Sequence, residues 1–147
     1  MTMHRRPLGR PRLLAILGAV VVLVGCVLPW WTVGGGPGEI TRLSGNAFDS
    51  SGIVVFVAAL VTIALVTLPY ARERPVGADR WTSYALVAAL AWAAFLYRIL
   101  DLLFAHAIAF DEPLDVITRV PGLWITGLGL VMLARSAFDR WQRPSEL

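Results

Sequence analysis

Lysine is absent from this chain, and cysteine occurs once, at Cys26. A single cysteine excludes a disulfide framework and a cysteine-based metal site within the chain. Charged residues are also scarce: they make up 16% of the sequence, while 57% of it is hydrophobic. Because roughly half or less of an ordinary soluble domain is apolar, this composition is typical of a membrane protein.

The net charge of +3 and the pI of about 9.8 would also suit a nucleic-acid-binding protein. However, the arginines lie in short segments that flank apolar runs, which is where orientation signals of membrane proteins are found. We therefore expect the lipid bilayer, and not nucleic acid, to be the partner of this surface.

Four apolar runs have the length that a helix needs to cross a bilayer. The predicted spans cover residues 13–31, 52–70, 81–103 and 120–138, and residues 1–12 are predicted to be a disordered cytoplasmic tail. No remaining segment is long enough to bury a core of its own, so residues 1–147 should form one membrane domain. The predicted fold is all-α: a polytopic membrane protein, built as an antiparallel bundle of four transmembrane helices.

The distribution of arginine predicts the orientation of this bundle. Four arginines precede the first run, three lie within residues 71–80 and three follow Ala134, whereas the other two loops hold only Arg42 and Arg119. The positive-inside rule then places both termini in the cytoplasm. The segment from Arg135 onward is amphipathic enough to lie on the membrane surface, with Trp141 as its anchor. Trp30, Trp31, Trp81 and Tyr84 are expected to be interfacial anchors as well.

Residues 23–26, Leu-Val-Gly-Cys, resemble the lipobox of a bacterial lipoprotein signal. Cleavage there would leave a lipidated Cys26. The apolar run nevertheless continues past Cys26 to Trp31, where a lipoprotein normally turns polar, so a buried cysteine in an uncleaved span is favoured.

Two loop motifs could bind ligands but are better explained as loops. The glycines of residues 34–38 lack the Gly-Lys-Ser/Thr ending of a phosphate loop. Asp111, Glu112 and Asp115 could hold a divalent cation, but they lack the EF-hand spacing, and a solvated loop is favoured. We expect no metal and no cofactor. Residues 39–43 alternate weakly, as a short strand or hairpin would.

The third span contains Arg98 and Asp101, and charges at that depth are costly. At 100° per residue, one side of the helix carries the polar groups and the small residues, and the other side is expected to face lipid. The first side holds Val87, Leu90, Ala91, Ala94, Tyr97, Arg98, Asp101 and Ala105, and the second holds Ala85, Ala89, Trp92, Leu96, Ile99 and Leu103.

Small residues are where transmembrane helices approach closely. The helix-packing positions that we expect are Ala91, Ala94, Gly122, Gly127 and Gly129. Arg98 and Asp101 lie one turn apart, and Tyr97 and Thr126 could complete a polar network with them. This intramembrane cluster either fixes helix register as a neutralised pair or binds a proton, an ion or an anionic ligand.

The chain resembles the uncharacterised small four-span integral membrane proteins that are common in actinobacteria. The resemblance rests on Leu28-Pro29-Trp30, the glycine-rich first loop, Ser51-Gly52, residues 97–101 (Tyr-Arg-Ile-Leu-Asp) and Gly122-Leu-Trp. Relatives often follow Arg-x-x-Asp with a Pro-Gly turn, whereas here residues 102–107 read Leu-Leu-Phe-Ala-His-Ala. The resemblance implies a multi-pass protein of the bacterial plasma membrane, and that family has no established activity to transfer.

Two functions are compatible with these residues. The first is a non-catalytic membrane protein with an accessory or structural role, such as a small subunit of a larger complex. The alternative is a small oligomeric transporter or ligand-binding bundle that uses Arg98 and Asp101. An enzyme is not expected, because the serines lack His–acid partners and the two histidines, His4 and His106, are predicted on opposite sides of the membrane.

Overall fold

The computed structural model describes residues 9–38, 41–71, 80–105 and 118–142. Its long elements are four helices, α1 (Arg10–Val27), α2 (Gly52–Ala71), α3 (Trp81–Ala105) and α5 (Pro121–Gln142). Each of the four is long and apolar enough to cross a membrane. The prediction of an all-helical chain with four such helices is therefore confirmed.

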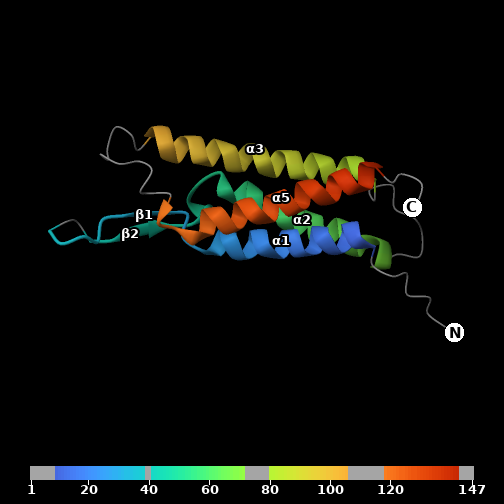
Figure 1. Cartoon of the computed structure of the whole chain (residues 1–147), viewed down its shortest axis with the longest axis horizontal. Helices are drawn as coiled ribbons and strands as arrows, with labels where there is room; N and C mark the ends of the chain where they lie inside the picture. The colour runs from blue at the N-terminus through green and yellow to red at the C-terminus, as the bar shows by residue number, and fades with distance from the viewer. Residues whose placement is uncertain (1–8, 39–40, 72–79, 106–117, 143–147) are drawn as a thin grey trace.

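The four helices lie side by side along the long axis of the molecule (Figure 1). α1 packs against α2 and α5, and α3 packs against the same two helices from the other side. α1 begins and α5 ends at one end of the bundle, which we call the Arg10 end, and a small β-hairpin extends from the opposite end, the hairpin end (Figure 1).

The hairpin joins α1 to α2. Its strands, β1 (Trp31–Val33) and β2 (Leu43–Gly45), pair antiparallel with Trp31 opposite Gly45. A 3-10 turn, η1 (Ala47–Asp49), follows, and it is closed by a capping box in which the Asn46 amide donates to Asp49 Oδ2 at 2.9 Å. The sequence predicted a short strand or hairpin over residues 39–43, whereas β2 begins only at Leu43. Residues 39–40 of that prediction lie outside the described residues.

The first helix is shifted toward the N-terminus relative to the predicted span 13–31. It includes Arg10 to Arg12, which were expected to belong to a disordered tail, and it ends at Val27 because the residue before Pro29 is held extended. The chain then turns Trp30 into the bundle, where it is fully buried and its indole N–H donates to the Gly25 carbonyl oxygen at 2.9 Å. The prediction that Trp30 is an interfacial anchor is wrong.

The fourth helix is longer than expected and continues to Gln142. Ser136, Ala137 and Arg140 are buried in it, so the part of the predicted surface segment up to Gln142 belongs to the bundle. The reason is that these residues continue the buried face of Leu130 and Leu133 at helical spacing. Residues 143–147 lie outside the described residues.

Helices α1 and α5 form the closest contact in the bundle, and glycines make it possible. Gly129 of α5 lies so near α1 that a Cβ atom there would be 2.7 Å from Val22 Cγ2 and 2.8 Å from the Gly18 carbonyl oxygen. Gly25 of α1 faces Thr126 with equally little space. Small residues allow two transmembrane backbones to approach in this way.

Candidate functional site

The polar site of the third span lies toward the hairpin end of α3 (Figure 1). Arg98 is 7% exposed and shares the buried face of the helix with Ala91, Phe95 and Leu102. These positions follow one another at intervals of three or four residues, which places them on one stripe of an α-helix. Asp101 is half-buried beside them.

Arg98 and Asp101 form an ion pair within α3. Arg98 Nη1 donates to Asp101 Oδ2 at 2.5 Å, one helical turn further along. The charge of the buried guanidinium is thus neutralised by its own helix. Arg98 Nε is also buried, and it has no hydrogen-bond partner among the described residues.

Tyr97 and Thr126 do not join this pair. Tyr97 is 62% exposed on the outside of the bundle, and Thr126, although fully buried, donates its hydroxyl to the Gly122 carbonyl oxygen of its own helix at 2.8 Å. A four-residue polar network, which the sequence allowed, is therefore not assembled; the structure brings together Arg98 and Asp101.

The buried face of α3 is rotated relative to the prediction. Leu90 was expected on the inner side but is 58% exposed, whereas Trp92 was expected to face lipid but packs partly against the core. Phe95 takes the central position and stands edge-on to Trp30, with ring centroids 5.7 Å apart. Phe95 also lies beside Gly127 of α5, where an added Cβ atom would still be 3.5 Å from the ring.

The predicted packing residues occupy different environments. Ala91 is fully buried, and Ala94, which is half-buried, accepts a hydrogen bond from the Ser51 hydroxyl at 3.3 Å. Gly122 and Gly129 face α1 and its C-terminal turn, and Gly122 donates its amide to the Pro29 carbonyl oxygen at 3.1 Å. Gly127 faces Phe95 of α3, and a Cβ atom added there would lie 3.5 Å from the ring, an ordinary contact distance.

A second buried cation lies at the Arg10 end and was not identified from the sequence. The guanidinium carbon of Arg140 is 3.7 Å from the centroid of the Tyr84 ring, and the two residues are 5% and 3% exposed. This is cation–π geometry between α5 and α3. Tyr84 was expected to be an interfacial anchor, and that prediction is wrong. The spacing of seven between Leu133 and Arg140 is the sequence signal that places Arg140 on the buried face.

Two cavities open on the sides of α3, and both are apolar. One lies between α3 and α5 and measures about 310 Å³, and the other lies between α2 and α3 and measures about 400 Å³. Neither is lined by Arg98, Asp101 or Arg140. These two cavities are therefore separate from the Arg98–Asp101 pair and from Arg140.

Three further hydroxyl groups bond back to the backbones of their own helices. Thr62 donates to Ala58, Thr67 to Ile63 and Ser136 to Leu133, at 2.9 to 3.0 Å. Cys26 is fully buried in α1 as a free thiol. Within the described ranges no group of three or more His, Cys, Asp and Glu side chains could hold a metal ion. The acidic residues 111–115 and His106 lie outside those ranges.

No family model, curated protein or solved structure matches the chain. The function is therefore inferred from the chain's own residues. Three features of the chain bear on its function: the Arg98–Asp101 pair, the Arg140–Tyr84 stack and the two apolar cavities beside α3.

Proposed function

We propose that this chain is a non-catalytic integral membrane protein with an accessory or structural role, acting as a small subunit of a larger membrane complex. The observation that carries this proposal is that Arg98 is neutralised by Asp101 on the same helix. A charge that is paired within its own helix stabilises the fold and leaves no net charge for a substrate.

The remaining polar groups support the same role. A transport route needs polar groups that follow one another across the membrane, but the hydroxyls of Thr62, Thr126 and Ser136 are occupied by their own backbones. The cavities beside α3 are apolar and do not reach the ion pair. The described residues thus favour a packed helical component over a conduit.

We place this component in the bacterial plasma membrane with both termini in the cytoplasm. Arg10, Arg12, Arg80, Arg135 and Arg140 all belong to the Arg10 end of the bundle, where α1 begins and α5 ends. Positive charge at that end favours its retention on the cytoplasmic side.

In-cell cross-linking followed by mass spectrometry tests the proposed role. We expect a larger membrane protein to be cross-linked to this chain at a fixed stoichiometry, and the same complex to survive extraction in mild detergent. Recovery of the chain alone, or cross-linked only to copies of itself, contradicts the accessory role.

A small oligomeric transporter or ligand-binding bundle is the second candidate, and one observation favours it. Arg98 Nε is buried and has no hydrogen-bond partner among the described residues, so a carboxylate or another anion would satisfy it. A proteoliposome flux assay tests this candidate: anion flux that disappears in Arg98→Gln supports transport, and an absence of flux rejects it.

A further inference from the structure

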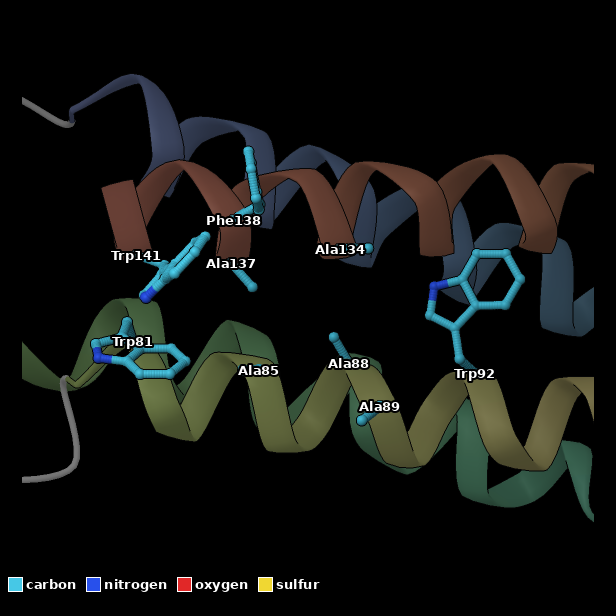
Figure 2. Close-up of a pocket in the computed structure, with 9 residues that line it drawn as sticks. All are labelled: Trp81, Ala85, Ala88, Ala89, Trp92, Ala134, Ala137, Phe138 and Trp141. Atoms are coloured by element: carbon cyan, nitrogen blue, oxygen red, sulfur yellow. The ribbon is translucent and has the colours of Figure 1, made fainter. Parts of the chain in front are cut away.

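The cavity between α3 and α5 is a slot with an alanine floor and aromatic ends (Figure 2). Ala85, Ala88 and Ala89 of α3 face Ala134 and Ala137 of α5 across it. Trp81 and Trp141 lie at one end of the slot and Trp92 lies at the other (Figure 2). The slot opens on the side of the bundle that faces away from α1 and α2.

Bulky contacts at both ends hold this slot open. Facing alanines would normally let two helices close on one another. Here the Trp92 indole reaches across to α5 and donates to the Leu130 carbonyl oxygen at 3.3 Å, while Arg140 lies stacked on Tyr84 toward the other end. These two contacts set the distance between α3 and α5, and the slot results from that distance.

The lining of the slot selects the kind of occupant. The slot holds about 310 Å³ and is lined by alanine and aromatic side chains, with no charged residue among them. An apolar space beside lipid loses dispersion energy if it stays empty, and a hydrocarbon chain is the slender apolar group available there.

The length and position of the slot match one leaflet of a bilayer. From Trp81 to Trp92 the helix rises by roughly 16 Å, which is close to half of the hydrocarbon thickness of about 30 Å. Trp81 and Trp141 are 39% and 54% exposed at the end where a lipid headgroup would lie. Tryptophan is enriched at this boundary between the acyl chains and the headgroups.

The charge at the same end selects the headgroup. Arg80 directly precedes Trp81 and is exposed. Among the described residues, Asp139 is the one acid at this end, and it is already paired with Arg135 at 3.2 Å. Arg80 can thus attract an anionic headgroup, a contribution of about 1 kcal/mol.

We propose that the α3–α5 slot binds one acyl chain of an anionic phospholipid, with the chain along the alanine floor, the glycerol region between Trp81 and Trp141, and the phosphate near Arg80. Lipid binding by this slot does not depend on the accessory role, because it is measured on the purified chain with defined lipids.

Native mass spectrometry of the full chain tests this binding. The protein is extracted from vesicles that contain equal amounts of phosphatidylglycerol and phosphatidylcholine with identical acyl chains. We expect one phosphatidylglycerol to be retained by each chain. Retention of no lipid, or of both lipids equally, overturns the proposal, and so does a dimer of the chain that fills the slot in place of lipid.

Two variants with matched controls locate the bound lipid. Ala89 lines the slot from an exposed position, and we expect Ala89→Leu to abolish retention by placing a larger side chain there. Ala93 is exposed one turn away and outside the slot, so Ala93→Leu should retain the lipid. Arg80→Gln should weaken phosphatidylglycerol binding about fivefold, and Arg42→Gln at the hairpin end should leave it unchanged. Unchanged retention in Ala89→Leu, with an unchanged melting temperature, overturns the assignment to this slot.

Discussion

Arg98 donates to Asp101 one turn further along α3, so this helix carries a buried cation and its counter-charge together. Removing the partner of a buried charge is costly because the remaining charge is left without compensation. The side chain of Asp101 is 33% exposed, so solvent offsets part of that cost.

We therefore expect Asp101→Asn to lower the free energy of unfolding in detergent by about 1–2 kcal/mol. The measurement is the thermal or denaturant midpoint of the purified protein. Asp139→Asn is the matched control, because Asp139 pairs with an Arg135 side chain that is 66% exposed, and it should change the midpoint little. Equal midpoints for Asp101→Asn and the unmodified chain would reject the structural role of the pair.

The double variant Arg98→Met, Asp101→Leu tests whether the ion pair stabilises the fold, or whether Asp101 only neutralises the buried charge of Arg98. Apolar replacement of both partners of a buried ion pair is often neutral or stabilising. We expect the double variant to be at least as stable as Asp101→Asn alone, as measured by the same midpoints. If the double variant is less stable than both Arg98→Met and Asp101→Leu, the pair stabilises the fold beyond the neutralisation of Arg98.

Two glycines of α5 should respond in opposite ways to the same substitution. A Cβ atom at Gly129 would press against Val22 and the backbone of α1, whereas at Gly127 it would meet Phe95 at an ordinary distance. Gly129→Ala should lose about 1–3 kcal/mol through overpacking. Gly127→Ala should be neutral or stabilising by up to about 1 kcal/mol, because alanine favours the helix. Comparable losses in both would contradict the close α1–α5 contact.

The stack of Arg140 on Tyr84 predicts that the aromatic ring matters more than the hydroxyl group. Tyr84→Phe keeps a ring beneath the guanidinium, and Tyr84→Leu removes it. We expect Tyr84→Leu to cost about 1–2 kcal/mol more than Tyr84→Phe in the free energy of unfolding. If the two variants unfold at the same midpoint, the ring contributes only its volume.

Cys26 gives a direct measure of burial and processing. Its thiol is free and fully buried in α1, so a maleimide should label the folded protein slowly and the denatured protein at once. The intact mass of the protein from cells should correspond to an unlipidated cysteine. Fast labelling in the folded state would contradict the burial of Cys26, and a lipid adduct at this residue would establish the lipoprotein alternative.

The sequence predicted the number of helices because hydrophobic length is a local property. It also placed Arg98 near Asp101, since two residues at i and i+3 meet on any helix. The rotation of α3 could not be predicted in the same way. It depends on the partners that Phe95 and Trp92 meet, Trp30 and Leu130, and these residues lie far from α3 in the chain.

The fates of Trp30 and Tyr84 illustrate the same limit. Each stands beside the end of an apolar run, where aromatic residues are enriched at the membrane boundary. Trp30 instead turns inward because the helix stops before Pro29, and Tyr84 is covered by an arginine from the far end of the chain. A residue at a boundary is therefore assigned to lipid or to the core by its tertiary neighbours.

The glycine-lined contact between α1 and α5 joins two helices that lie far apart in the sequence. α5 is synthesised after α1, α2 and α3, so α1 meets its closest partner late. Until α5 is in place, the face of α1 formed by Gly18, Val22 and Gly25 lacks the backbone that packs on it. Closure of this bundle therefore depends on α5, and a chain truncated before Pro121 would keep three apolar helices but lack this contact.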